Sequence, residues 1–433
     1  MKGGSGISNG LQHVHESTPL LGMKEGASRK ASTLKTYGNI FVAIVGSGVL
    51  GLPYTFKTSG YAVAAISVVC SAVLSWHCMM KLVKCRNELE SRNNHIVVSY
   101  GDLGELAFGN WARQFVDLMI LISQSGCCVA YLIFIGQNVA SIVTGDISRY
   151  SYFIAILFPL QMLLSWIRSL AGLAPFSFFA DACNILAMAV VVKDDVHDFT
   201  DFSKVTAFQG WSAVPFAVGV AIYCYEGFGM TLTLQSSMQR PKEFGRALAV
   251  AFGFITALYV FFGFIGYLAY GDETKDIITL NLPNDWTTIA VKGGLSIGLF
   301  FTFPVMLYPV HEIFERKMLM CQWFQDYCSH PVLELSMRNG LRGLIVLAIA
   351  IVAATVPGFG LFISFVGSTV CAMIAFVIPA LLHIQICGES SSFVSKLVDS
   401  TLIISGVVFA GYGTFATGLD IFRANQPGPL PGA

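Results

Sequence analysis

Long apolar segments separated by short polar segments run along the chain from residue 37 onward. An α-helix needs about 20 mostly apolar residues to cross the hydrocarbon layer of a bilayer. The pattern therefore predicts an all-α membrane protein with eleven transmembrane helices. The predicted helices are Tyr37–Thr58, Tyr61–Val83, Phe115–Val143, Tyr152–Ser169, Gly172–Val192, Trp211–Gln235, Phe244–Tyr270, Thr287–Ile313, Leu341–Val356, Phe359–Ile386 and Val398–Thr417.

The loops between these helices predict their orientation. Most of the 26 lysines and arginines lie in the N-terminal segment and in every second loop after it, whereas the other loops are acidic. Basic residues favour the cytosolic loops of membrane proteins, so we predict a cytosolic N-terminus and a lumenal C-terminus. Residues 1–36, which are polar and rich in glycine and serine, are predicted to be a disordered cytosolic tail, and 421–433 a short C-terminal tail after the membrane domain 37–420.

Composition agrees with this class and excludes others. The chain is 55% hydrophobic, 12% charged and has a formal net charge of +0, whereas soluble domains carry about 25% charged residues. The sequence contains no block of lysines and arginines of the kind that indicates nucleic-acid binding. The eleven cysteines have no metal-site spacing, and the sequence has no catalytic dyad or nucleotide-binding loop. We therefore predict that the protein is not an enzyme and has no cofactor and no metal.

The first predicted helix is interrupted by the stretch "VGSGVLGLPYTF", residues 45–56. Gly46, Gly48 and Gly51 fall within six residues, and Pro53 follows. Glycine and proline are tolerated in a membrane helix where other groups satisfy the freed backbone. A glycine face for helix packing is the alternative, but its usual spacing is Gly-x-x-x-Gly. We therefore predict an unwound segment here.

The sixth predicted helix is interrupted by "AIYCYEGFGMTL", residues 221–232. Glu226 lies near mid-membrane and is followed by Gly227 and Gly229. A charge at that depth costs about 3 kcal/mol on insertion scales. The cost favours a functional Glu226 over one that is merely paired or protonated inside the bundle.

The two interrupted helices are five apart in the order of helices. Two inverted repeats of five helices, here 37–192 and 211–386, would place them in equivalent positions, with 398–417 as an extra eleventh helix. Broken helices in such positions favour a binding site at the membrane midplane. Free N–H groups at a half-helix N-terminus suit a carboxylate, and free carbonyls at a C-terminus suit an ammonium group or a cation. The pattern predicts a zwitterionic substrate.

These motifs resemble those of the amino acid/auxin permease family, within the amino acid–polyamine–organocation superfamily. The stretches that carry the resemblance are "GSGVLGLPYTFKTSG", "SWHCMMKLVKC" and "AIYCYEGFGMTLTLQSSMQRP". The last two are similar to the proton-coupled branch of the family, and the whole chain is most similar to plant vacuolar amino acid transporters of the AVT type. The resemblance implies the inverted-repeat fold of the bacterial leucine transporter and secondary transport of neutral amino acids by alternating access.

The resemblance also implies roles for residues at the two interruptions. The backbone near Gly46, Ser47 and Gly48 would hold the substrate carboxylate. Tyr131 would face the site, although packing between helices is an equally good interpretation. Phe228 would shape the side-chain pocket, although core packing is the better interpretation of it. The substrate amine would be held by the backbone near Cys224, Tyr225, Glu226 and Gly227.

Several ionisable residues lie at membrane depth and bear on the coupling ion. Chains of such groups form proton relays in transporters, and Glu226 and Asp181 are the candidates for proton coupling. We interpret His77 and His383 as packing near the interface, and Lys292 as extending to it. Sodium is the alternative coupling ion, for which the hydroxyls of Ser296 and Thr302 are available.

The N-terminal tail contains "ESTPLL", in which Glu16 precedes Leu20 and Leu21. An acidic residue followed by two leucines resembles the sorting signal that adaptor complexes read for lysosomes and vacuoles. We therefore predict the vacuolar membrane and export of substrate to the cytosol, with the plasma membrane as the alternative. The competing interpretations of function are a non-transporting amino acid sensor of the same fold, sodium-coupled uptake and a channel.

Overall fold

The computed structural model describes residues 33–93, 97, 99–167, 182–183, 185–193, 205–283, 285–322, 324, 331–356, 358–389 and 391–424. Asp181 lies outside these residues, and so does the sorting motif at Glu16, Leu20 and Leu21. Their predicted roles therefore stay predictions.

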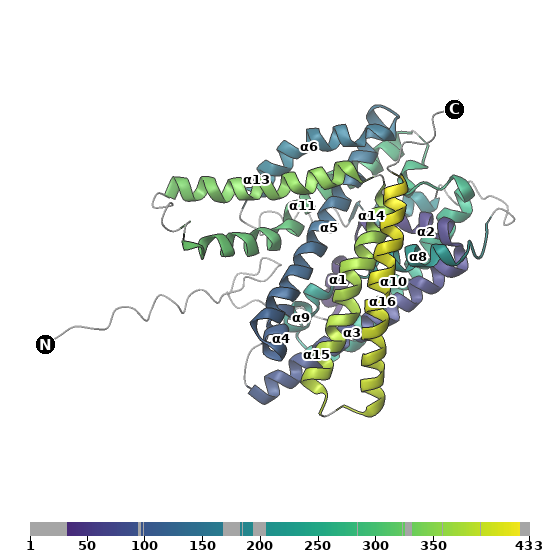
Figure 1. Ribbon diagram of the computed structural model, residues 1–433. Coiled ribbons are helices and arrows are strands. Elements are labelled where there is room, and N and C mark those ends of the chain that lie inside the picture. Colours follow the sequence, from purple (N-terminus) through teal and green to yellow (C-terminus); the bar gives the residue numbers. More distant parts are fainter. Residues whose placement is uncertain are drawn as a thin grey trace.

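The described residues form a bundle of helices (Figure 1). Two π-helical turns, Gly367–Cys371 and Met373–Val377, join α14 (Phe359–Val366) to α15 (Ile378–Cys387) into one continuous rod. The α-helices are α1 (Thr33–Ile44), α2 (Leu52–Ser59), α3 (Tyr61–Asn93), α4 (Tyr100–Phe108), α5 (Asn110–Val143), α6 (Tyr150–Ser165), α8 (Val214–Cys224), α9 (Phe228–Ser237), α10 (Phe244–Tyr270), α11 (Trp286–Leu319), α13 (Pro331–Thr355), α14 (Phe359–Val366), α15 (Ile378–Cys387) and α16 (Phe393–Ala424).

Among the described residues, nine helices are long and apolar enough to cross a membrane. The first predicted helix is divided into α1 and α2, which are individually too short to be counted. The fifth, 172–192, falls largely outside the described residues, although 185–193 is helical. The all-helical membrane architecture is therefore confirmed, whereas the count of eleven helices and the pairing of two five-helix repeats stay predictions.

Some helices differ from their predicted bounds. Helix α13 begins at Pro331 rather than at Leu341, because its polar first part is held by ion pairs between Arg338 and Glu315 (2.6 Å) and between Arg342 and Glu315. Hydropathy cannot detect such a polar extension. The short helix α4 was not predicted at all, although Ser99 and Asp102 form a capping box at its start, which is a signal that the sequence does carry.

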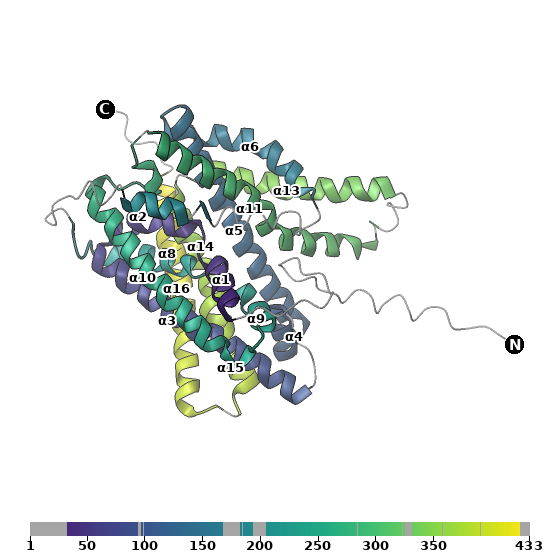
Figure 2. The ribbon, with the colours of Figure 1, turned by 180° about the vertical axis from the view of Figure 1, so that it is seen from behind.

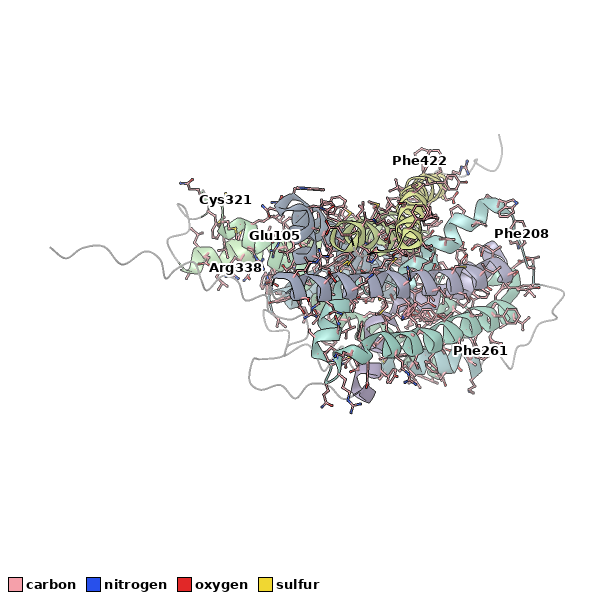
Figure 3. The ribbon with its side chains drawn as sticks, turned by 90° about the horizontal axis from the view of Figure 1, so that it is seen from below. Glu105, Phe208, Phe261, Cys321, Arg338 and Phe422 are labelled. Carbon is pink, nitrogen blue, oxygen red and sulfur yellow. The ribbon has the colours of Figure 1, made fainter. Side chains whose placement is uncertain are left out.

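The helices fall into two groups on either side of α5. Helices α6, α11 and α13 pack on α5 and on one another, whereas α2, α3, α8, α10, α14 and α15 pack together on its other side. Figures 1 and 2 show the first group extending from α5 on one side of the molecule. Seen from below in Figure 3, Phe261 of α10 and Phe422 of α16 lie on the outside of the bundle, with exposed fractions of 51% and 62%. Such exposed apolar side chains suit a surface that faces lipid.

Helix α8 and the rod that begins with α14 approach each other closely at two glycines, where backbone meets backbone. A Cβ added to Gly219 would lie 2.5 Å from the carbonyl oxygen of Ser364, and one added to Gly367 would lie 1.8 Å from the carbonyl oxygen of Gly219. Real Cβ atoms do not come so close to other atoms, so only glycine fits at both positions. This glycine contact lies where the first π-helical turn begins.

A buried cluster of charged side chains joins α3, α15 and α16. The carboxylate of Asp399 accepts hydrogen bonds from Lys81 Nζ and, at 2.7 Å, from His383 Nδ1, and all three residues are at most 5% exposed. Lys84 Nζ lies 3.4 Å from His383 Nε2. The sequence did not predict this buried partner for His383, because Asp399 lies on the next helix, 16 residues along the chain. The position of His383 near the membrane interface stays a prediction.

Lys292 also differs from its prediction. Its side chain is buried within α11, with the residue 1% exposed, and its Nζ donates to Ser141 Oγ of α5 at 3.1 Å. It does not extend to the interface, because α5 covers this face of α11.

A candidate substrate site between two broken helices

The first interruption separates α1 from α2. Helix α1 ends at Ile44, Val45 and Gly46 are not helical, and a 3₁₀ turn, Ser47–Gly51, leads into α2. Gly46 has an extended backbone with φ −116° and ψ −166°. The last carbonyls of α1 and the first N–H groups of the following turn therefore face the interruption, where helical partners are missing.

The second interruption separates α8 from α9. Helix α8 ends at Cys224, Tyr225 forms a turn, and Glu226 and Gly227 are not helical before α9 begins at Phe228. Both interruptions that the sequence predicts are thus present. Each creates a half-helix C-terminus with negative dipole character, and α9 also presents an N-terminus with positive character.

The two interruptions lie against each other. A Cβ added to Gly48 would lie 3.1 Å from Cys224 Sγ and 3.1 Å from the ring of Tyr223. A Cβ on Gly227 would lie 3.6 Å from the side chain of Ile44. The predicted carboxylate-binding and amine-binding segments are therefore neighbours in space, as one zwitterion with adjacent charges would require.

A tyrosine that sequence reasoning missed connects the two half-helices. Tyr259 of α10 is 0% exposed, and its hydroxyl lies 3.4 Å from the carbonyl oxygen of Ile44 and 3.4 Å from that of Cys224. These are the last residues of α1 and α8. Nothing in the sequence of α10 distinguishes Tyr259 from its other aromatic residues, so only the packing of the three helices reveals this contact.

The Glu226 carboxylate faces α5. Its Oε1 accepts a hydrogen bond from Ser123 Oγ at 3.3 Å, and the same hydroxyl lies 3.7 Å from Cys371 Sγ. Glu226 itself is only partly covered by protein. A carboxyl group at a helix break, held by one hydroxyl and partly accessible, can exchange a proton with a substrate or with water. Ser123 and Cys371 were also missed, because serine and cysteine are common in membrane helices.

Ser47 presents a buried hydroxyl at the first interruption. The residue is 1% exposed, and its Oγ has no hydrogen-bond partner among the described residues. An unsatisfied buried hydroxyl costs about 1–3 kcal/mol, so the position suits a group that hydrogen-bonds a ligand. Tyr131 of α5 and Phe228 of α9 are 7% and 1% exposed and belong to the surrounding core.

A second polar region lies over α2, in the loop between α10 and α11. A cavity of about 490 Å³ is lined there by polar side chains that include Tyr54, Lys57, Gln137 and Asp276. Asp276 Oδ2 accepts from the N–H of Phe359, at the start of α14, at 2.9 Å, and from Gln137 Nε2 at 3.4 Å. The loop therefore closes over α2, α5 and α14 together.

Because Asp276 is buried, we expect the stability of this closed loop to depend on pH. Burial raises the pKa of the Asp276 carboxyl, and the hydrogen bonds from Phe359 and Gln137 oppose that rise. Closure thus favours the protonated acid, so the stability that Asp276 gives the closed loop is present at low pH and is lost as pH rises through the raised pKa. Hydrogen exchange of 271–283, corrected for its intrinsic rate, should therefore be slower at a pH below 3.8, the ordinary pKa of an aspartic acid, than at neutral pH.

The Asp276→Asn variant is the matched test of that pH dependence. Asparagine stays neutral and keeps an oxygen to accept from Phe359, so protection of the loop should become nearly independent of pH. If the variant keeps the wild-type difference between the two pH values, another group titrates in its place.

No metal site accompanies these features among the described residues, where no group of three or more His, Cys, Asp or Glu side chains is placed to hold an ion. The polar groups at the interruptions are backbone carbonyls, N–H groups, hydroxyls and one carboxyl. Such a set suits a small molecule with both positive and negative groups.

The family model described as "transmembrane amino acid transporter protein" matches residues 29–419. "Amino acid transporter ANT1" of Arabidopsis thaliana is 46% identical over 400 residues, which cover 90% of this chain and 92% of that protein. "Amino acid transporter AVT3C" of the same plant is 40% identical over 433 residues, covering 94% and 95%.

More distant proteins also match. "Proton-coupled amino acid transporter-like protein pathetic" of Drosophila melanogaster is 25% identical over 411 residues, covering 90% of this chain and 85% of that protein. A solved structure of a sodium-coupled sialic acid symporter covers 92% of this chain at 10% identity with a TM-score of 0.46, too weak a similarity to bear on the site. The family match extends over both interrupted helices and over the loop that contains Asp276. The chain is therefore a multi-pass membrane protein of the amino acid/auxin permease family, similar to the plant transporters of the AVT type.

Proposed function

We propose that this protein is a secondary active transporter of neutral amino acids, with the substrate bound between the two interrupted helices. The observation that supports it most directly is the contact of the two interruptions through Tyr259, which brings the last carbonyls of α1 and α8 together. The unpartnered hydroxyl of Ser47 and the N-terminus of α9 lie at the same interruptions. An amino acid supplies the ammonium and carboxylate groups that such a set of dipoles can bind. The names of the relatives, which are amino acid transporters, support the same substrate class.

We propose a proton as the coupling ion, with Glu226 as its carrier. Glu226 stands at the second interruption, where binding of the substrate amine and binding of a proton can influence each other. Sodium coupling through α11 receives less support: the hydroxyls of Ser296 and Thr302 donate to carbonyls of their own helix, at 2.7 Å and 2.9 Å. The name of the Drosophila relative is consistent with a proton.

The Glu226→Gln variant tests this role. Glutamine keeps an oxygen that accepts from Ser123 but does not titrate, so exchange of substrate across the membrane should continue. Accumulation driven by a pH gradient should fall to the level seen without a gradient. A variant that still accumulates substrate in response to the gradient would assign coupling to another residue.

We propose the vacuolar membrane as the location, with the N-terminus and its adaptor-binding motif in the cytosol and the acidic loops in the lumen. Export to the cytosol would then run down the proton gradient. Replacing Leu20 and Leu21 with alanine should move a fluorescently tagged protein away from the vacuole. An unchanged location would show that the motif does not direct sorting.

The proposal as a whole is tested by counterflow in proteoliposomes with a panel of radiolabelled amino acids, with and without a pH gradient. We expect exchange of neutral amino acids, and accumulation that follows the pH gradient and ignores sodium. Uptake that needs sodium and ignores the pH gradient would contradict proton coupling. Saturable binding without any flux would favour the alternative function, an amino acid sensor of the same fold.

A further inference from the structure

We propose that Tyr259 is a specificity-determining residue, whose hydroxyl oxygen completes a site of three oxygens for the ammonium group of a primary amine. The other two oxygens are the carbonyls of Ile44 and Cys224. The inference rests on the proposed function, because it names how the substrate is recognised at the same interruptions.

The geometry at the hydroxyl leaves capacity for a ligand. A tyrosine hydroxyl carries one proton and accepts as well as donates. Here that proton is shared between two carbonyls, each at 3.4 Å, whereas an O–H···O bond is normally about 2.7–2.8 Å. Both contacts are therefore long, and each carbonyl retains a lone pair for another donor.

Three nearby carbonyls already accept hydrogen bonds from backbone groups. The carbonyl of Phe41 accepts from the N–H of Val45 at 2.8 Å. Those of Ile222 and Tyr223 accept from the N–H groups of the two residues that follow α8, each at 3.2 Å. The final carbonyls of α1 and α8 are the ones that meet Tyr259, and they carry the negative ends of both helix dipoles. An ammonium group has three N–H donors, which match three oxygens.

Tyr259 is held in place independently of the ligand. Its ring lies 5.5 Å from that of Tyr225, which stacks on Phe252 with centroids 5.4 Å apart. The hydroxyl of Tyr225 donates to Thr256 Oγ1 at 2.9 Å. Helix α10 therefore fixes the position of the Tyr259 oxygen beside the interruption, so that little is lost in ordering it when the amine binds.

This site should distinguish primary amines from N-methylated ones. An N-methyl group removes one donor and leaves one of the three oxygens without a partner. A site built to hydrogen-bond a donor discriminates strongly against an analogue that lacks it. For one such bond, we expect wild-type protein to prefer the primary amine by roughly tenfold or more in kcat/KM.

The experiment is counterflow with L-alanine and N-methyl-L-alanine, and with L-leucine and N-methyl-L-leucine, in wild-type protein and in Tyr259→Phe. The variant keeps the ring and loses only the hydroxyl. We expect KM for the primary amines to rise by roughly tenfold, maximal rates to change little, and the preference over the N-methyl compounds to fall to roughly threefold or less. Tyr267→Phe is the matched control, because Tyr267 is also a buried tyrosine of α10 but its hydroxyl accepts from the N–H of Thr206 at 3.2 Å, away from the interruptions. That control should keep the wild-type preference.

Each outcome bears on the inference. If wild-type protein transports N-methyl and primary amines equally well, or if Tyr259→Phe keeps the wild-type preference, the three-oxygen site is wrong while amino acid transport stands. A wild-type protein that exchanges no amino acid contradicts the proposed function itself. If the variant does not fold, the preference of wild-type protein for primary over N-methylated amines still tests the inference, because a site of three oxygens requires that preference.

Discussion

Replacing Gly48 with valine is expected to abolish transport while leaving a folded protein in the membrane. The first side-chain carbon of valine would lie 3.1 Å from both Cys224 Sγ and the Tyr223 ring, and two further methyl groups extend beyond it. These neighbours form the last turn of α8, so relief of the clash must displace the second interruption. Overpacking of this kind costs about 1–3 kcal/mol, which a large membrane bundle tolerates more easily than the substrate site does.

Gly38→Ala is the matched control for this experiment. Gly38 lies within α1, and a Cβ on it meets no atom within 4 Å. Counterflow rates and thermal unfolding of both purified variants provide the measurement. Gly38→Ala should transport at close to the wild-type rate. Wild-type transport by Gly48→Val would refute the role of tight packing between the two interruptions.

The second large effect is expected at Asp399, where replacement by alanine should strongly destabilise the fold. The variant leaves the ammonium group of Lys81 buried without its partner and removes the acceptor for His383 Nδ1. Breaking a buried ion pair in this way costs about 3–5 kcal/mol of unfolding free energy. Thermal unfolding in detergent should show a clear fall in Tm.

Two comparisons make the Asp399 result specific. Combining Asp399→Leu with Lys81→Met removes both charges and should recover most of the lost stability, because replacement of a whole buried pair by apolar groups is often neutral. Glu88→Ala breaks a more exposed ion pair on α3, the helix that carries Lys81; its partner there is Arg92, at 2.8 Å. This variant should change the free energy of unfolding by about 0–1 kcal/mol. Equal losses at Asp399 and Glu88 would contradict a special role for the buried cluster.

Hydropathy predicts the helices of this protein well because lipid requires long apolar segments, and glycine together with Glu226 predicts where two of them break. These signals are local in sequence. The same approach assigned His383 to the interface, since it lies toward the end of an apolar segment. Asp399, the partner of both His383 and Lys81, is a single acidic residue in another helix, and only the docking of α16 brings the three together.

The candidate site likewise combines features that are local in sequence with features that depend on packing. The spacing of Gly46 and Gly48 makes their segment predictable. Tyr259 and Ser123 cannot be identified in this way, because one tyrosine or serine in an apolar helix has no distinguishing pattern. Their importance comes from what lies opposite, namely two carbonyls and one carboxyl group supplied by other helices. The predicted roles of the site residues themselves stay predictions until transport is measured.

The contact between Gly219 and Gly367 constrains how such a protein can change over evolutionary time. Because backbone touches backbone there, the separation of α8 from the rod formed by α14 and α15 is set by the thickness of the polypeptide itself and not by side-chain size. A new substrate preference therefore cannot be reached by widening or narrowing that spacing. It has to come from faces of α8 that carry side chains, such as the one where Tyr223 meets Gly48. The glycine pair thus separates the part of this fold that is fixed from the part that is free to diversify.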